Sequence, residues 1–517
     1  MEQVQVSSNN KRIAKNTSYL YLRMILVMGV GLYTSRIVLS TLGVSDYGIN
    51  NVMSGIIGML VYVNTLLSGA SSRFITIDLG KGDTFELKKT FSMTNTLAVA
   101  AAIVILVLGE TVGLWFMMNK LNIDPERMDA AGWVYQCALF TCCLSVLQTP
   151  YQASIIAHEK MDIYAYMSVF DVIMKLMVVY LLLVFSYDKL KLYAVLNAVV
   201  SLLNFIIYRI ICVKRFDECS MSFSFETNKF KAMLNYSSWN MLGALANVLN
   251  GAGLNILINI FFGTIVNAAR GIAQQASQIV TQFYSNFQMA SRPQIMKYYA
   301  QNDITNMSKL ICNSSKYCAY LLLCIIIPIF FNVTGLLMVW LGQVPPYTSW
   351  FVRLMLLQIL FQAIDLPIGM GIHAVGKMVL PNITATVLYL SVFPVTYLVW
   401  KFGAGPIAGY AVYLSFTPFI LLIDLWILHK YTGFNRKIYV YNSILPIVEI
   451  AIAGSIVPAV LHFFHYPNSL WVVLIDTLIC GLYVVAIVYY VGLPKHIRKK
   501  LIEVITKKML LRKNSNI

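Results

Sequence analysis

Uninterrupted apolar runs of about 20 residues recur along the whole of this 517-residue chain. A helix of that length crosses the hydrocarbon core of a bilayer, because each residue adds about 1.5 Å. The runs do not alternate polar and apolar residues, as the strands of an outer-membrane barrel do. We therefore expect an all-α polytopic membrane protein.

The composition excludes the classes of chain that fold in water. Only 12% of the residues are charged and 58% are hydrophobic, whereas soluble domains are about a quarter charged. The nine cysteines mostly lie inside apolar runs and form no CxxC motif, so neither a disulfide framework nor a metal site is predicted. The net charge of +17 is explained by basic helix ends, and no nucleic-acid partner is expected.

The apolar runs divide into fourteen predicted membrane-spanning segments. Their connections are short, so no soluble domain fits between them. The segments are residues 16–41, 47–70, 90–117, 131–157, 164–186, 191–213, 233–262, 264–291, 309–332, 350–373, 381–400, 406–428, 443–463 and 470–492.

Lys and Arg set the predicted orientation. With the N-terminus inside, 27 of the 39 lie in inner regions and five lie in outer loops. Basic residues concentrate on the cytoplasmic side of membrane proteins, so both termini are predicted to be cytoplasmic. No cleavable signal is expected, because the first apolar stretch is too long for the core of a signal peptide.

The chain matches itself weakly at an offset near 219 residues. Arg73 pairs with Arg292, and, at an offset of 217, Pro150 pairs with Pro367. A repeat of six helices enters the membrane twice from the same side, which predicts two parallel lobes around a central cleft. The predicted parts are an N-lobe over 1–213, a cytoplasmic linker over 214–232, a C-lobe over 233–428, two additional helices over 429–492 and a basic cytoplasmic tail over 493–517.

One face of the eighth segment is polar over its full length. A helix that faces lipid has no use for such a face, so it indicates a wet cavity or hydrogen bonds between helices. Eight positions exceed what helix packing needs, and we predict that they line the cleft. They are Arg270, Gln274, Ser277, Gln278, Thr281, Gln282, Ser285 and Gln288, with Arg270 and the glutamines at 274, 278 and 282 as the substrate-binding candidates.

Polar faces also occur in the first, second and seventh segments, including Asn51 and Asn255. Under the repeat, segments 1 and 2 correspond to segments 7 and 8, so the same pair is polar in each lobe.

Basic residues inside the spans are costly and each needs a reason. Arg23 lies on the polar face of the first segment and is favoured for the cleft over Arg36, which can snorkel to the outer surface. Lys316 and Arg353 are further candidates for substrate binding. Arg73 and Arg292 lie at inner helix ends, where they either anchor the orientation or form an inner rim that meets anionic headgroups.

Two acidic positions are candidates for coupling transport to H⁺ or Na⁺. Asp171 and Lys175 are four residues apart, and they form either a self-neutralising helical pair or an ion relay. Asp365, just before Pro367, is the most isolated acid in the spans and the better candidate. No catalytic set can be assembled outside the spans, so no enzyme, ATPase or cofactor is expected.

The region of the first two segments resembles a known family. Residues 35–39 (SRIVL), 42–49 (LGVSDYGI) and 70–74 (ASSRF) are similar to the start of the Wzx-type polysaccharide and O-antigen flippases. These belong to the multidrug/oligosaccharidyl-lipid/polysaccharide exporter superfamily. The resemblance covers the whole chain in layout, although fourteen spans departs from the commoner twelve, as the related lipid II flippases also do.

This resemblance implies a flippase for an undecaprenyl-pyrophosphate-linked oligosaccharide, which it moves from the inner to the outer leaflet of the bacterial cytoplasmic membrane by alternating access. Family members carry basic residues in the cavity on segments 1, 2 and 8, which Arg23 or Arg36 and Arg270 match. Arginine suits phosphate oxygens, and neutral polar side chains suit sugar hydroxyls. The partners implied are this substrate, membrane lipids and a coupling ion, and a monomer is expected.

Two alternatives stay open. An ion-coupled multidrug exporter of the same superfamily would favour carboxylates in the cleft. A membrane glycan polymerase or ligase would need a long outer loop with catalytic residues, and the longest predicted outer loop is 118–130.

Overall fold

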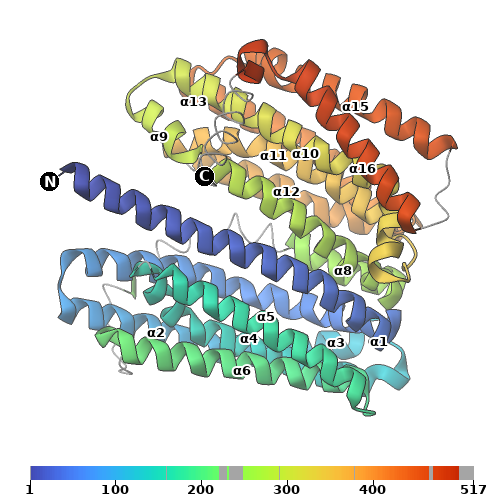
Figure 1. The fold of residues 1–517 in the computed structure, drawn as a ribbon. Coiled ribbons are helices and arrows are strands. Elements are labelled where there is room, and N and C mark those ends of the chain that lie inside the picture. Colours follow the sequence, from blue (N-terminus) through green and yellow to red (C-terminus); the bar gives the residue numbers. More distant parts are fainter. Residues whose placement is uncertain are drawn as a thin grey trace, which may run out of the picture. The chain divides into compact units, whose positions relative to one another are not determined.

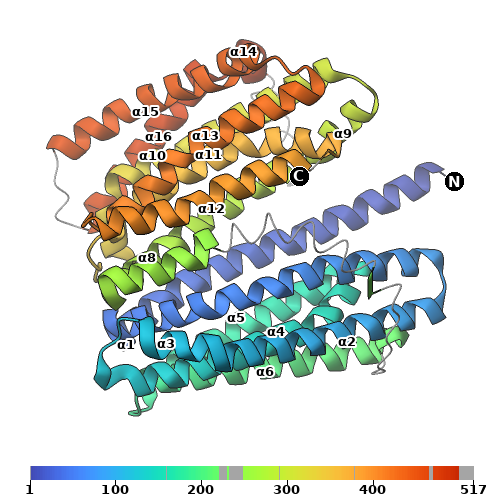
Figure 2. The same ribbon diagram turned by 180° about the vertical axis from the view of Figure 1, so that it is seen from behind.

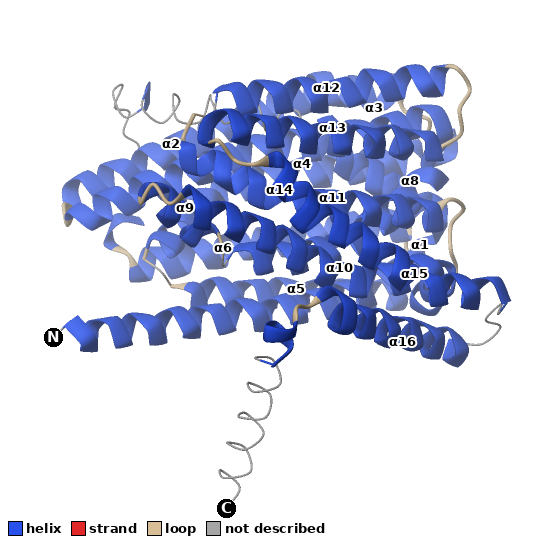
Figure 3. Ribbon diagram, turned by 90° about the horizontal axis from the view of Figure 1, so that it is seen from above, coloured by secondary structure: helices blue, strands red, loops and turns tan. Residues whose placement is uncertain are grey.

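The structure is a computed structural model that describes residues 2–158, 160–219, 230–231, 249–289, 291–377, 379–464 and 470–499. The side chains of residues 2–25 and of a few later positions are not described. Within these ranges the chain consists of helices and short connections, and no strand occurs (Figure 3). The predicted fold class, an all-α polytopic membrane protein, is confirmed.

Twelve helical stretches in the described ranges are long and apolar enough to cross a membrane. Two of them are interrupted at a glycine: α1 (Glu2–Lys81) at Gly43, with φ 79° and ψ 170°, and α8 (Leu254–Met289) at Gly263, with φ 78° and ψ −169°. Glycine adopts a positive φ without steric cost, unlike other residues. Dividing the two stretches at these glycines gives the fourteen segments that the sequence predicts, although residues 233–248 of the seventh lie outside the described residues.

The two glycine breaks support the internal repeat. Gly43 and Gly263 have nearly the same backbone conformation and are 220 residues apart, within one residue of the offset read from the sequence. Each stands between the first and second segment of its repeat.

The helices divide into two compact units. The first contains Met1–Gly271, Trp340–Tyr347 and Ala385–Gly409, and the second contains Ile272–Val339, Thr348–Thr384 and Tyr410–Ile517. The predicted lobe boundary at 213 lies within α6 and the one at 233 lies outside the described residues; the lobes, the linker and the basic tail stay a prediction.

The helices of the first unit that belong to the first repeat form one bundle. Figures 1 and 2 show them as long rods side by side, with α1 packed against α4 and α5, and α4 against α2 and α6. They are α1, α2 (Thr84–Leu108), η1 (Gly109–Gly113), α3 (Leu114–Lys120), η2 (Pro125–Arg127), α4 (Met128–Ala157), α5 (Met161–Val184), α6 (Lys189–Arg215) and η3 (Asp217–Cys219), followed by η4 (Leu249–Gly253) and the start of α8. Buried side chains such as Ile49, Met53 and Tyr135 form its core.

The second unit begins within α8. Its core is formed by buried apolar side chains that include Ile311, Ile368 and Leu428. The remaining elements of the chain are α9 (Arg292–Ala300), α10 (Ile304–Leu341), α11 (Thr348–Val375), α12 (Val379–Lys401), α13 (Ile407–Thr432), α14 (Arg436–Tyr439), η5 (Val440–Ile444), α15 (Leu445–Phe464), α16 (Leu470–Ile487) and η6 (Val488–Gly492).

The motif that carries the family resemblance lies at the first break. Gly43 supplies the positive φ, and Asp46 accepts a hydrogen bond from Nε of Arg127 at 2.9 Å. The same guanidinium donates through Nη1 to Asp188 at 2.8 Å, and Asp188 also caps the N-terminus of α6. The motif residues therefore have a structural role: they hold the end of the bundle that is predicted to face outside, called the outer end below.

Candidate functional site

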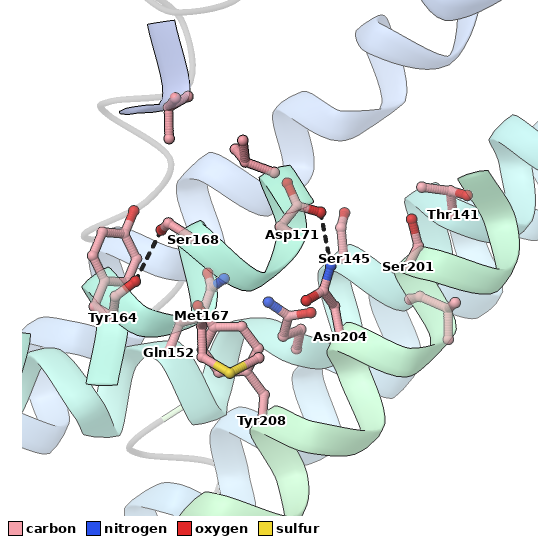
Figure 4. Close-up of a pocket in the computed structure, with 14 residues that line it drawn as sticks. Thr141, Ser145, Gln152, Tyr164, Met167, Ser168, Asp171, Ser201, Asn204 and Tyr208 are labelled. Carbon is pink, nitrogen blue, oxygen red and sulfur yellow. Dashed lines mark hydrogen bonds between the residues drawn. The ribbon is translucent and has the colours of Figure 1, made fainter. Parts of the chain in front are cut away.

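A polar pocket of about 300 Å³ lies inside the first unit, between α1, α4, α5 and α6 (Figure 4). Along each of the last three helices its polar residues are spaced by three and four, so each helix presents one face to the pocket. They are Thr141, Ser145, Gln148 and Gln152 from α4, Tyr164, Ser168 and Asp171 from α5, and Ser201, Asn204 and Tyr208 from α6.

Asp171 is the one charged residue among those that line this pocket. Its Oδ1 accepts a hydrogen bond from Nδ2 of Asn204 at 2.8 Å, and its Oδ2 lies 2.8 Å from Nζ of Lys175 (Figure 4 shows the bond to Asn204). The helical ion pair that the spacing allows is therefore formed. Asn204 is 8% exposed, yet its Oδ1 has no hydrogen-bond partner among the described residues. A carboxylate and a free amide oxygen facing a pocket can accept a proton or a small cation.

A second pocket of about 460 Å³ continues the polar lining towards the outer end. It shares Thr141 and Ser145 with the first pocket and adds Asn50, Ser54 and Asn197. Polar groups therefore follow α4 over both pockets.

The outer part of the predicted stripe on α8 is buried. Arg270 is 7% exposed and its Nη2 donates to the backbone oxygen of Gly251 at 2.5 Å. Its Nε has no hydrogen-bond partner in the described part of the chain. Gly251 belongs to η4, a π-helix, and such segments often occur at functional sites.

The inner part of the stripe divides into exposed and buried residues. Gln274, Gln278 and Gln282 are exposed at successive turns of α8. Gln288, in contrast, is fully buried and donates to the backbone oxygen of Ala363 at 2.5 Å. That carbonyl is available because Pro367, four residues on, has no N–H to donate to it.

The other predicted basic residues differ in their exposure and contacts. Arg23 lies in α1, but its side chain is outside the described residues, whereas Arg36, Arg73 and Arg292 are exposed. Arg353 donates through Nε to the backbone oxygen of Phe330 at 3.0 Å and lies over the Trp350 ring. Lys316 is half-buried beside the ring of Tyr317.

Asp365 has a partner that the sequence did not reveal. Its carboxyl group lies close enough to that of Asp424, which comes from α13, for the two to interact. Two neighbouring carboxyl groups rarely ionise together, so such a pair can hold a shared proton. No local sequence pattern indicates that Asp365 and Asp424, which lie on two helices and 59 positions apart, are neighbours.

The pocket residues of α4 and α6, in contrast, could have been found from the sequence. Thr141, Ser145, Gln148 and Gln152 recur at helical spacing within an apolar run, which is the signal that singled out α8. Sequence reasoning weighed only the charged pair on α5 in this region.

Comparison with known proteins shows a shared fold. No protein-family model matches the chain, and no curated protein matches it in sequence. Among solved structures it is similar to the lipid II flippase MurJ in an inward closed conformation, with a TM-score of 0.69 and 14% identity over 92% of this chain and 99% of that one.

The chain is also similar to multidrug resistance MATE family transporters of the MOP superfamily. An inward-facing structure gives a TM-score of 0.62 at 12% identity, covering 81% of this chain and 98% of that one, and an outward-facing structure gives 0.53 at 14%, covering 81% and 96%. At these identities the likeness shows the fold, that of multi-pass membrane transporters.

Proposed function

We propose that this protein is a flippase that moves an undecaprenyl-pyrophosphate-linked oligosaccharide from the inner to the outer leaflet of the bacterial cytoplasmic membrane. The likeness to a lipid II flippase over 92% of the chain supports a lipid-linked substrate. The related MATE structures include inward-facing and outward-facing conformations, which supports alternating access by the two predicted lobes. Both termini are cytoplasmic in this proposal, the chain acts as a monomer, and it catalyses no chemical step.

The observation that carries the proposal is the chemistry of α8. One arginine inside an apolar span, Arg270, lies one turn before three exposed glutamines, Gln274, Gln278 and Gln282. Arginine binds phosphate oxygens through two parallel N–H groups, and primary amides hydrogen-bond sugar hydroxyls. In this proposal Arg23 is the second cation that binds the phosphate. Arg73 and Arg292 form a rim at the inner entrance or anchor the orientation of the helices.

Coupling to H⁺ or Na⁺ is assigned to the acids. The pocket around Asp171 offers a carboxylate and a free amide oxygen, and Asp365 with Asp424 offers a carboxyl pair. Asp365→Asn leaves the pair with one ionisable carboxyl group, that of Asp424. The dependence of the transport rate on the ion gradient should therefore weaken. A transport rate with an unchanged response to the ion gradient would remove Asp365 from this role.

The test of the substrate uses the bacterium from which the gene comes. Deletion should abolish surface glycan and cause the lipid-linked intermediate to accumulate, and the wild-type gene should restore display. Arg270→Ala should reduce display at least about tenfold at an equal amount of protein in the membrane, since one charged contact to phosphate is worth about 1.5–3 kcal/mol. The matched control is Lys401→Ala, which removes an exposed charge at a helix end. Normal display with Arg270→Ala would refute its role.

A multidrug exporter is the second candidate function. The likeness to MATE transporters and the acids inside the spans of both units favour it. It predicts that the deletion leaves surface glycan intact and raises sensitivity to cationic drugs. A glycan polymerase or ligase would instead leave shortened or unattached glycan already on the outer side.

A further inference from the structure

Three asparagines form a closed ring of hydrogen bonds near the outer end of the first unit. Nδ2 of Asn51 donates to the backbone oxygen of Asn267 at 2.7 Å, and Nδ2 of Asn267 donates to that of Asn255 at 2.9 Å. Nδ2 of Asn255 completes the ring by donating to the backbone oxygen of Asn51 at 2.8 Å. Asn51 follows the Gly43 break in α1, and the other two lie on either side of the Gly263 break in α8.

The ring is nearly removed from solvent. Asn255 is 2% exposed and Asn267 is fully buried, whereas Asn51 is half-buried. A buried amide that loses its partner bears the full cost of its lost hydration, so the three amides fix both the distance and the register of the segments. The ring is thus a fastening in a literal sense: its hydrogen bonds join specific residues of the first and second halves of the sequence.

Glycines allow this close approach. A Cβ atom at Gly271 would lie 2.8 Å from Cγ of Asn51, and one at Gly48 would lie 2.7 Å from the carbonyl carbon of Thr264. Asn51 and Gly271 are 220 residues apart, and Ser45 and Thr264, whose hydroxyls are 3.4 Å apart, are 219 apart. Each of these two contacts therefore joins a residue to its equivalent in the other repeat, or to the residue next to that equivalent.

Arg270 adds a second bond between the two segments that carry Asn255 and Asn267. It follows Asn267 by three residues and donates to Gly251, which precedes Asn255 by four. The same two segments are therefore joined twice. An arginine can bind a phosphate by donating two hydrogen bonds from Nε and Nη2. Arg127 donates to the carboxylate of Asp46 through the same two atoms in this structure. On Arg270, Nε has no partner among the residues that the structure describes, and Nη2 donates to Gly251.

We infer that the Asn51–Asn255–Asn267 ring is the outer latch of the transport cycle, and that Arg270 couples it to an anionic group of the substrate. The inference rests on the proposed alternating access. A phosphate that takes the Nε and Nη2 edge of Arg270 withdraws Nη2 from Gly251, which loosens the two segments that hold Asn255 and Asn267 against Asn51. The substrate thereby favours opening on the outer side, because a ligand shifts an equilibrium by its differential affinity for the two states.

The latch is tested without any substrate. A cysteine at Gln274, one turn inside Arg270, is labelled in intact cells by a membrane-impermeant maleimide added outside. Asn51→Ala and Asn255→Ala should each raise the labelling rate on the order of fivefold, since each removes one of the two ring bonds that join Asn51 to α8. The protein without the introduced cysteine gives the background from its nine native cysteines.

The matched control is Asn119→Ala. Nδ2 of Asn119 donates to the backbone oxygen of Trp115 within its own helix at 2.8 Å, so its loss removes an amide bond inside a single helix. Its labelling rate should stay within about twofold of wild type. Unchanged labelling in both ring variants, at normal membrane amounts, would overturn the latch, and so would an equal rise in the control.

A second measurement works even if the alanine variants fail to insert. Nδ2 of Asn51 and Oδ1 of Asn255 are 3.4 Å apart, so cysteines at these two positions should cross-link on oxidation. The cross-link should stop transport and block outside labelling, and a reductant should restore both. Transport that continues through the cross-link would refute the latch.

Inorganic pyrophosphate tests the coupling. In the purified protein it should slow this cross-linking at least about twofold when Arg270 is present and leave the rate unchanged in Arg270→Gln. No effect of pyrophosphate, with the labelling result intact, would remove the coupling role of Arg270 and leave the latch. Normal glycan display in the gene deletion would remove the proposed substrate alone, so the failures are distinguishable.

Discussion

The two parts of α8 carry one polar face but use it in different ways. In the outer part, residues 264–271, the polar groups of Asn267 and Arg270 are buried and bonded to Asn255 and Gly251, which precede the Gly263 break. In the inner part, residues 272–289, Gln274, Gln278 and Gln282 are exposed. The spacing of polar residues is the same in both. A helical stripe therefore identifies a face, and its surroundings decide whether that face fastens helices or meets water.

The largest effect is expected where the outer part packs most tightly. Gly48→Ala places a Cβ against the backbone of Thr264 and should lower the free energy of unfolding by about 3 kcal/mol, because a backbone cannot move aside like a side chain. Gly58→Ala is the matched control, since nothing lies within 4 Å of its Cβ position. The melting temperatures of both variants in detergent provide the measurement. Equal temperatures would show that the packing at the outer end is looser than described.

The inner part of α8 is tested by the water accessibility of its residues. Single cysteines at Gln274, Gln278 and Gln282 should react with a water-soluble maleimide at least about tenfold faster than cysteines at Val280 and Tyr284, which are buried. Reaction rates measured on isolated membranes that expose both sides give the ratio. Equal protection at all five positions would remove the contrast with the outer part.

The outer end also holds an ionic contact, which can be separated from the amide ring by pH. Burial opposes the ionisation of Asp188, but its hydrogen bonds from Arg127 and from the N–H groups of Lys191 and Leu190 outweigh this and lower its pKa. A lowered pKa stabilises the fold above the unfolded value of about 4, and this stabilisation is lost as the pH falls through the folded value.

Asp188→Asn keeps the helix cap and removes the charge. It should lower the free energy of unfolding at pH 7 by about 1 kcal/mol, as expected for a partly exposed ion pair. The difference from wild type should vanish in acid. Melting curves of both proteins across this pH range provide the check, and a difference that persists in acid would exclude the ionic contribution.

The smallest effect is expected at the outermost contact. The hydroxyls of Ser45 and Thr264 are 3.4 Å apart at an exposed position, where water can replace either partner. Ser45→Ala should therefore change the free energy of unfolding by less than about 0.5 kcal/mol and leave outside labelling of α8 unchanged. A large effect would show that the hydroxyl pair, rather than the buried ring, fastens the outer end.

Much of the fold followed from the sequence alone. Apolar runs of membrane length and the bias of Lys and Arg are local properties, and each predicted span that falls in the described ranges coincides with a helix. Gly43 and Gly263 lie between predicted spans because a positive φ ends a helix wherever it occurs. The repeat was visible for the same reason, since it is a property of the residue order.

The partners of the polar groups were decided by tertiary structure. Nothing in the order of residues shows that Asn51 bonds Asn255 and Asn267, or that Asp365 lies beside Asp424. An amide or a carboxyl group in an apolar span must find a partner or water, and sequence periodicity states only on which side of its helix it lies. The sequence by itself determined that this chain spans a membrane and where its spans break. The packing of helices distant in sequence decided which polar residues close the outer end and which stay exposed.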